Sequence, residues 1–431
     1  MRRWVPRVFI IFGVVGTGLF LFKSPARVVE FEFQGASIAG GRQPRLEEEE
    51  APVRALTSST PTSSLKDADE FDVERQPRLS LRPQAVKAIY ATGWTAGSTK
   101  RINALIDLID QTELNAIVID VKDYSGYVSY RTDSSLVKDV GAEKEIRIAK
   151  PNALIKQLHD KGIYTIARIT VFQDPVAARA HPEWALKKKG SSELWQDDKG
   201  LMWLDPSSPE VWHYNVEIAE DAARRGFDEI NFDYIRFPTD GATSEIDYPH
   251  WRGEEKHEVI ENFFRFLRGR LSGVPLSADI FGLATVEAND LGIGQDLEVI
   301  LPYFDFVMPM VYPSHYAHGF NGFVNPAEHP YEVIQYSMEK AVQRLMNFGK
   351  ESDEEATSTT ATSTQSTRPA LATKLRPWLQ DFDLGAEYTA DMVRKEIQAA
   401  YASGKDSPQA LDGWALWNPS NHYTSEALES N

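Results

Sequence analysis

FDEINFDYIRFP, residues 227–238, has the pattern of a buried β-strand over 229–237. Successive side chains of a strand point to opposite faces, so Asn231 and Asp233 share one face. An amide and a carboxylate that point into a core cost free energy unless they serve a site. The stretch therefore predicts a strand that delivers a functional carboxylate.

Outward from this strand, short runs rich in β-branched residues alternate with helical patterns. The other expected strands lie at 86–94, 116–123, 163–172, 275–281, 305–312, 375–382 and 413–417, and the expected helices at 98–112, 152–161, 209–225, 256–271, 331–348 and 390–402. Eight strands with intervening helices predict the α/β class and a (β/α)₈ TIM barrel. A doubly wound sheet is the competing fold, but its glycine-rich phosphate turn is poorly matched by TGWTAG at 92–97.

The composition limits the chemistry that this barrel can perform. The 431 residues include 46 Lys and Arg against 63 Asp and Glu, a net charge of −17. Nucleic acid is not an expected partner, because binding it requires a basic surface. The chain has no cysteine, which excludes disulfides, thiol nucleophiles, iron–sulfur clusters and thiolate zinc sites. Carboxylates, histidines and hydroxyls remain as the chemical groups.

The first 26 residues have the pattern of an export segment. Three arginines among the first seven residues precede an uncharged run over 8–22. The pattern predicts a signal peptide, cleaved near the small residues Ser24 and Ala26, or an uncleaved signal anchor, which we favour. We therefore expect an extracytoplasmic protein that the N-terminal helix anchors to the membrane, or a secreted one if the signal is cleaved.

The remaining composition shifts divide the chain further. Residues 27–82 contain acidic and Ser/Thr/Pro-rich runs that predict a disordered linker. The barrel domain is expected over 83–424, with a low-complexity insertion at 351–370. This insertion follows a helix, so we expect it at the end of the barrel opposite the catalytic end.

Candidate site residues follow from the ends of the strands, where TIM barrels place their catalytic groups. The candidate catalytic acids are Asp120, Asp233 and Asp279. The candidate substrate-binding residues are Trp94, Asp123, Arg168, Asn231, Arg236, Tyr312, His315, Trp378, Gln380, Asp381 and Trp417. Carboxylates among aromatic side chains are typical of a carbohydrate site.

The strand at 227–238 also resembles the fourth strand of the bacterial putative glycoside hydrolase family, a (β/α)₈ group of the glycosyl hydrolase TIM-barrel superfamily. Further similar segments, which extend the resemblance over about 86–419, are YATGW (90–94), ARI (167–169), WLDP (203–206), SADIFG (277–282), GIGQ (292–295), MVYPSHY (310–316) and RPWLQ (376–380). The resemblance implies a barrel hydrolase without naming its substrate. By analogy with the alpha-amylase group, Asp233 resembles the nucleophile. Amylase-like barrels have an arginine where this chain has Asn231, and barrel chitinases have a glutamate where it has Ile235, so neither mechanism transfers intact.

The candidate acids differ in their expected roles. Asp279 is the predicted general acid/base, because its apolar neighbours should desolvate it and raise its pKa. Asp120 is the second choice, and Lys122 on the same strand face is expected to keep it ionised. Arg168 and Arg236 are expected to orient carboxylates or to bind an acidic sugar. Alternatively, these acids and arginines form a structural ion-pair network.

Two functions are consistent with these residues and with the resemblance. The first is a glycoside hydrolase that cleaves a cell-surface or extracellular polysaccharide with two carboxylates around an oxocarbenium-like transition state. The alternative is a non-catalytic glycan-binding barrel at the cell envelope, and a lyase or transglycosylase would fit the same scaffold. We expect no cofactor and no metal, because His315 and His318 lie in a loop without an accompanying carboxylate. Two inward carboxylates would favour the enzyme, whereas one carboxylate saturated by arginines would favour the binding protein.

Overall fold

A computed structural model describes residues 72–358 and 373–431. Its central sheet consists of parallel strands: β1 (Val86–Ala91), β2 (Ala116–Lys122), β3 (Tyr164–Thr170), β5 (Glu229–Asp233), β7 (Leu276–Phe281), β8 (Phe306–Met310), β9 (Lys374–Leu375), β10 (Trp378–Gln380) and β11 (Gly413–Trp417). The strand order is β10-β11-β1-β2-β3-β5-β7-β8-β9, and the sheet closes because β10 also pairs with β8. Since β9 and β10 are two pieces of one barrel position, the structure confirms the predicted eight-stranded TIM barrel.

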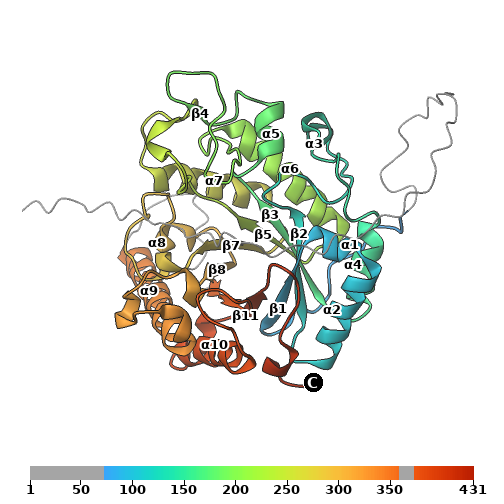
Figure 1. Ribbon diagram of the computed structural model, residues 1–431, viewed down its shortest axis with the longest axis vertical. Helices are drawn as coiled ribbons and strands as arrows, with labels where there is room; N and C mark the ends of the chain where they lie inside the picture. Colours follow the sequence, from blue (N-terminus) through green and yellow to red (C-terminus); the bar gives the residue numbers. More distant parts are fainter. Residues whose placement is uncertain (1–71, 359–372) are drawn as a thin grey trace, which may run out of the picture. The chain divides into compact units, whose positions relative to one another are not determined.

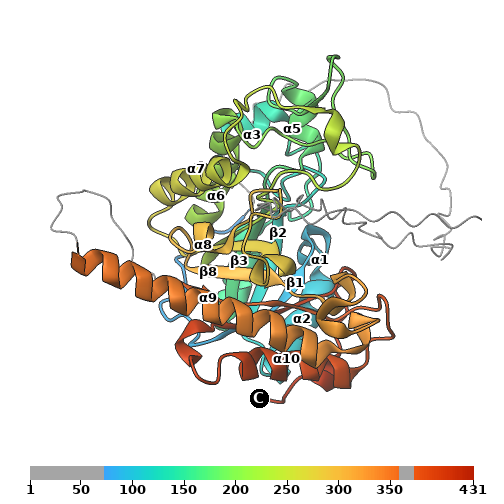
Figure 2. The same cartoon turned by 90° about the vertical axis from the view of Figure 1, so that its left-hand side faces the viewer.

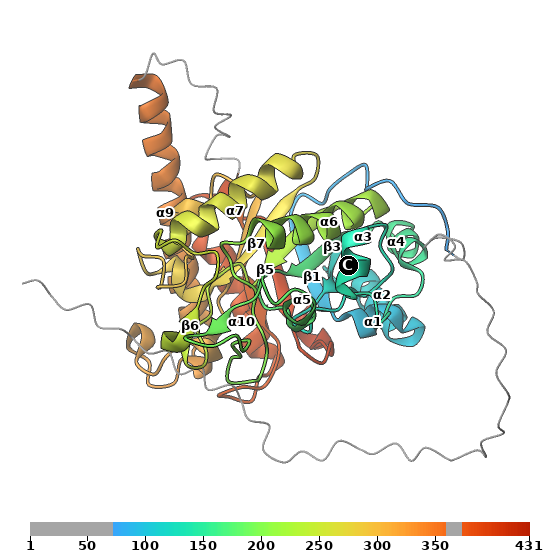
Figure 3. The ribbon, with the colours of Figure 1, turned by 90° about the horizontal axis from the view of Figure 1, so that it is seen from above.

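Helices alternate with the barrel strands and surround them (Figure 1). The main helices are α2 (Thr99–Gln111), α4 (Pro151–His159), α6 (Pro209–Arg225), α7 (Lys256–Arg270), α8 (Leu297–Ile300), α9 (Pro330–Ser358) and α10 (Ala390–Ser403), and the short ones are α1 (Gly93–Gly97), α3 (Ser135–Val140) and α5 (Pro175–Ala180). Helix α9 packs on α10 (Figure 2), and α6 packs beside α7 (Figure 3). Outside the barrel, β4 (Lys187–Lys188) and β6 (Ile246–Asp247) form a small antiparallel pair.

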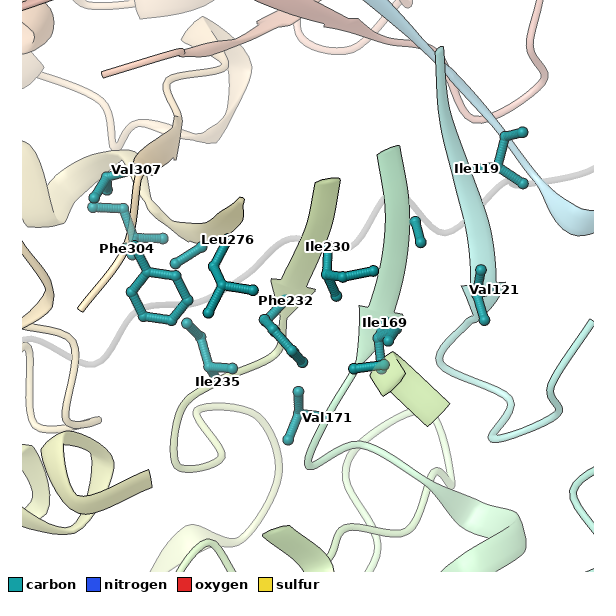
Figure 4. Packing of buried hydrophobic residues seen from close by; sticks show 14 of the residues in the cluster. Ile119, Val121, Ile169, Val171, Ile230, Phe232, Ile235, Leu276, Phe304 and Val307 are labelled. Atoms are coloured by element: carbon teal, nitrogen blue, oxygen red, sulfur yellow. The ribbon is translucent and has the colours of Figure 1, made fainter. Parts of the chain in front are cut away.

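The alternation along each strand separates two apolar layers. Side chains on the outer face pack beneath the helices (Figure 4), among them Ile119, Val121, Ile169, Val171, Ile230 and Phe232. Side chains on the inner face form a second cluster inside the barrel, which consists of Val86, Ala88, Tyr90, Ala116, Val118, Tyr164, Ile166, Met308, Tyr312, Trp378 and Ala415. Because Ile230 and Phe232 face the helices, the same alternation turns Asn231 and Asp233 into the barrel.

An ion network fills the amino-terminal end of the barrel interior. Arg376 donates from Nη1 to Glu229 Oε1 at 2.8 Å and from Nη2 to Asp412 Oδ2 at 2.6 Å. All three side chains are fully buried. Tyr164 adds a hydrogen bond from its hydroxyl to Glu229 at 3.3 Å. These groups bind one another at the amino-terminal end of the barrel, opposite the carboxyl ends of the strands where barrel enzymes place their sites. We therefore assign them a role in stabilising the barrel.

Residues 72–82, the described part of the expected linker, lie against the barrel. The Asp72 carboxylate accepts hydrogen bonds from the N–H of Asn152 at 2.8 Å and of Ala153 at 3.0 Å, where α4 begins. Gly226 ends α6 with a φ of +112°, and a Cβ there would lie 2.3 Å from the Gln76 carbonyl oxygen. Glycine therefore lets this segment approach α6. The predicted anchor over 1–26 and the rest of the linker lie outside the described residues.

Several predicted element ends were wrong. β5 stops at Asp233, well before the predicted 237, because Tyr234 takes a left-handed φ of +54°. The predicted seventh strand is interrupted around Pro377, which has no N–H for the ladder. Helix α9 continues past the predicted 348 to Ser358, into the predicted insertion at 351–370.

Within residues 72–358 and 373–431, no helix combines the length and the apolar character that crossing a bilayer requires.

Candidate active site

Four charged side chains meet inside the carboxyl-terminal end of the barrel. Arg168 of β3 donates from Nη1 to Asp120 Oδ1 of β2 at 2.6 Å, and from Nη2 to Asp233 Oδ2 of β5. Its Nε lies 3.6 Å from Asp279 Oδ2 of β7. All four side chains are buried. The structure thus brings the three predicted catalytic acids together around one arginine, and we call these four residues the acid cluster.

The acids occupy different sides of the guanidinium. Asp233 and Asp279 lie along the edge formed by Nη2 and Nε, whereas Asp120 is bound at Nη1. That edge is the one with which arginine binds a carboxylate in a bidentate manner. Asp233 and Asp279 thus approach two adjacent nitrogens of the same guanidinium.

Asp279 is a buried acid with two hydrogen-bond donors on one oxygen and a raised pKa. Its Oδ1 accepts hydrogen bonds from Asn231 Nδ2 and from Trp378 Nε1, both at 2.8 Å. Burial and the nearby Asp233 charge raise the pKa of Asp279 to about 8, although Arg168 opposes the shift. Asp279 is therefore protonated at neutral pH. Because Oδ1 already accepts two hydrogen bonds, the proton belongs on Oδ2.

Asp233 accepts hydrogen bonds at both oxygens of its carboxyl group. Oδ2 accepts from Arg168, and Oδ1 accepts from the backbone N–H of Tyr234 at 2.6 Å. The left-handed conformation of Tyr234 costs about 1–2 kcal/mol for a residue with a side chain. It aims this N–H back at the carboxylate, and strain of this kind concentrates at functional sites.

Asp120 is the second acid whose pKa is raised. Burial raises the pKa of Asp120 to about 6, while Arg168 acts in the opposite direction. Its Oδ2 accepts a hydrogen bond from the Tyr90 hydroxyl at 2.5 Å. Tyr90 was not among the predicted site residues, although it lies in the YATGW segment and on the inner face of β1. That inward position is the signal that could have identified it.

The predicted pairing of Lys122 with Asp120 was wrong. The ladder between β2 and β3 shifts register between these two residues, which breaks the alternation. Lys122 instead donates to Asp174 Oδ2 at 2.7 Å and to Asn215 Oδ1 at 2.8 Å, where it is fully buried. Its role is to tie β2 to the loop after β3 and to α6.

Aromatic rings line the acid cluster. The Trp417 ring stacks on Tyr90 with centroids 3.9 Å apart, and the Arg168 guanidinium lies 5.1 Å from the Trp417 centroid. Trp378 meets Trp417 edge to face at 5.5 Å. Tyr312 is buried nearby, and its pKa is raised well above the usual value by burial and by the charges of Asp279 and Asp233. These rings exclude water, which explains the raised pKa of Asp279.

Three other predicted residues lie outside the acid cluster. Trp94 on α1 is 54% exposed, and Asp123 forms an ion pair with Arg147 at 2.5 Å. The Arg147 guanidinium also lies 5.4 Å from the Trp94 ring centroid, so these residues form one group after β1 and β2. His315 packs on Tyr312 with ring centroids 5.1 Å apart, and desolvation by its neighbours together with the Lys199 charge lowers the pKa of His315.

Gln380 and Asp381 support loops. Gln380 Oε1 accepts from the Ser314 hydroxyl at 2.8 Å, which joins β10 to the loop after β8. Asp381 accepts from the Thr424 hydroxyl at 2.7 Å and from its N–H at 2.9 Å. Both acceptors are thus occupied within the fold. Arg236, the last predicted residue, lies in the turn after β5 and is buried among aromatic rings.

Two surface hollows lie away from the acid cluster. One of about 650 Å³ opens at the amino ends of the strands, beside Lys87, Lys374 and Tyr401. Another of about 300 Å³ lies between α9 and α10. We place the candidate site at the acid cluster, because burying one arginine with three acids, two of them with raised pKa values, is costly and typical of catalytic sites.

A closed parallel barrel with acids at the carboxyl ends of its strands is the architecture of a TIM-barrel glycoside hydrolase. Residues 88–423 match the family described as "Putative glycosyl hydrolase domain", and the chain belongs to this family.

Several solved structures are similar to this chain. One is a hypothetical protein from Ruminiclostridium thermocellum (41% identity over 44% of this chain and 96% of that one, TM-score 0.41). Others are the alpha-galactosidase TtGalA from Thermus thermophilus (12% identity over 81% and 61%, TM-score 0.47) and alpha-L-fucosidase isoenzyme 2 from Paenibacillus thiaminolyticus (13% identity over 80% and 48%, TM-score 0.46). No curated protein matches.

Proposed function

We propose that this protein hydrolyses glycosidic bonds in a cell-surface or extracellular polysaccharide by a two-carboxylate mechanism. The observation that supports this most directly is the pair of acids on one edge of Arg168. The pKa of Asp279 is raised to about 8, whereas Asp233 accepts hydrogen bonds from the Arg168 guanidinium and from the Tyr234 N–H. A carboxyl group that can donate a proton beside a second carboxyl group that can attack the anomeric carbon is the arrangement that glycoside hydrolysis requires.

The acids take complementary roles in the proposed reaction. Asp279 gives its Oδ2 proton to the glycosidic oxygen as the bond from that oxygen to the anomeric carbon breaks. Asp233 attacks the anomeric carbon and forms a glycosyl ester. The Asp279 carboxylate then takes a proton from water, whose oxygen attacks the same carbon and releases Asp233. Arg168 binds the charge on Asp233 at the start and the end of the cycle.

The neighbouring position of the two acids also indicates the stereochemistry. Carboxyl groups about 5–5.5 Å apart belong to retaining enzymes, whereas inverting enzymes keep about 6.5–9.5 Å for a water molecule. Asp233 and Asp279 share one guanidinium edge, which favours the shorter separation. We therefore propose retention of the anomeric configuration.

The proposed location of the substrate follows from the N-terminal sequence. The arginines and the uncharged run over 8–22 support export of the barrel across the cytoplasmic membrane, with an anchor or a cleaved signal. Cell fractionation with protease treatment of intact cells tests this. Protection of the barrel from external protease would contradict it.

The activity is tested by screening the full-length protein against a polysaccharide panel, with release of reducing ends as the readout. Asp233→Asn should lower the rate by at least about 10³-fold while it keeps the fold and the binding of polysaccharide. Asp391→Asn is the matched control, because Asp391 lies on the surface of α10 in an ion pair with Lys395. NMR of the first product should show the anomer of the substrate.

Equal product release by wild type and Asp233→Asn would remove Asp233 from the mechanism. Binding without product by the wild type would support the glycan-binding barrel instead.

A further inference from the structure

Arg236 is a buried arginine in an aromatic cage beside the acid cluster. It lies in the turn after β5, three residues beyond Asp233, and is only 5% exposed. The carbon of its guanidinium lies 4.9 Å from the ring centroid of Trp203, 5.5 Å from that of Tyr234 and 4.7 Å from that of Phe281. The rings come from the loop after β3, the turn after β5 and the end of β7, so the cage is built from neighbouring parts of the barrel mouth.

Within the described residues the charge of Arg236 has no carboxylate partner within 4 Å. Nη1 donates to the Phe237 carbonyl and to the Thr239 hydroxyl, both at 3.1 Å, and Nε and Nη2 donate to no described residue. The other buried arginines of the described residues are paired: Arg147, Arg168, Arg225 and Arg376 each bind a carboxylate. A buried charge without a partner is costly, so an unpaired arginine at this position requires an explanation.

More distant charges do not remove this cost. Burial lowers the pKa of Arg236, while Asp240, Asp233 and Asp197 act in the opposite direction from further away. Asp197 is itself occupied, because it accepts hydrogen bonds from Gln173 and Trp203. The free Nε and Nη2 groups form the edge that fits a planar carboxylate.

We propose that Arg236 binds a carboxylate of the sugar next to the cleaved bond, so that the substrate is a polysaccharide containing uronic acid. This rests on the proposed function, since it places the anion beside Asp233. A carboxylate would complete the ion pair that the fold leaves open, while the rings of Trp203 and Phe281 hold the guanidinium in place. The net charge of −17 would repel a long polyanion, so the recognition concerns one carboxylate at a defined position.

The test measures binding with polygalacturonate and alginate oligosaccharides, each beside its carboxyl-reduced, neutral form. Wild type should bind the acidic form at least about tenfold more tightly than the neutral form. Arg236→Met, which keeps the length of the side chain but not its donors, should lose this preference, and Arg236→Lys should keep part of it. Arg265→Met is the matched control, because it removes one positive charge from a surface ion pair with Glu261 on α7.

Thermal unfolding separates recognition from a structural role. Arg236→Met should melt at or above the wild-type temperature, because it removes an unpaired buried charge. The proposal is overturned by any of four results: equal wild-type binding of acidic and neutral forms, an acid preference that survives Arg236→Met, a lower melting temperature with loss of binding to both forms, or tighter binding of sulfated oligosaccharides than of uronates.

Binding and turnover also separate uronate recognition from hydrolysis. Uronate binding that depends on Arg236, without cleavage of any polysaccharide, would leave this inference standing while the hydrolase proposal fails. Cleavage of a neutral polysaccharide at the same rate by wild type and Arg236→Met would support the hydrolase proposal and contradict uronate recognition by Arg236.

Discussion

Replacing Asp279 with asparagine should flatten the dependence of the folding free energy on pH. The amide fits the site, because its Oδ1 can still accept from Asn231 and Trp378 as the carboxyl does. Its NH₂ group takes the place of the protonated Oδ2. The substitution therefore removes one titration and leaves the packing in place.

The size of the effect follows from linkage. The carboxyl of Asp279 has a pKa of 3.8 in the unfolded chain and about 8 in the fold. Between these values the folded protein holds a proton that the unfolded chain has lost, so stability present below pH 4 is lost as the pH rises towards 8. Each pH unit in this interval removes about 1.4 kcal/mol per proton, or roughly 2.7 kcal/mol from pH 5 to pH 7.

Urea unfolding at pH 5, 6 and 7 measures this difference. As the pH rises, the unfolding free energy of Asp279→Asn minus that of the wild type should increase by about 1.4 kcal/mol per pH unit, because all other titrating groups are common to both proteins. Asp391→Asn, on the surface of α10, should run parallel to the wild type. If Asp279→Asn also runs parallel, Asp279 is ionised at neutral pH and cannot be the proton donor.

Three further predictions concern other parts of the barrel. The kcat/KM of hydrolysis should fall above about pH 8 as Asp279 loses its proton, and a flat profile from pH 7 to pH 9.5 would contradict this role. Arg376→Met should lower the free energy of unfolding by about 3–5 kcal/mol while the activity per folded molecule is unchanged, since it leaves the buried Glu229 without a cation and Asp412 with Arg82 alone. Denaturant unfolding measures the first effect and active-site titration the second. Trp94→Ala should raise KM several-fold with kcat unchanged and stability within about 0.5 kcal/mol, because its ring is exposed at the barrel mouth, and an unchanged KM would remove Trp94 from substrate binding.

The local pattern predicted the strands well where alternation is strict. Ile230 and Phe232 face the helices, and Asn231 and Asp233 face the barrel, as the period of two requires. The pattern failed where a single backbone torsion ends a strand or a register shift turns the following side chain to another face. Tyr234 ends β5 early, and the shift after Asp120 sends Lys122 to Asp174.

The amino-acid sequence by itself predicted the barrel, because eight apolar strands with intervening helices fit either a barrel or a doubly wound sheet, and the poorly matched glycine-rich turn at 92–97 favours the barrel. It also determined which acids end the strands. The tertiary structure alone decided that Asp120, Asp233 and Asp279 share Arg168, and that Arg236 is left without a carboxylate among the described residues. The physical reason is that charge compensation and desolvation depend on distances between strands far apart in the chain, which no periodicity along one strand contains.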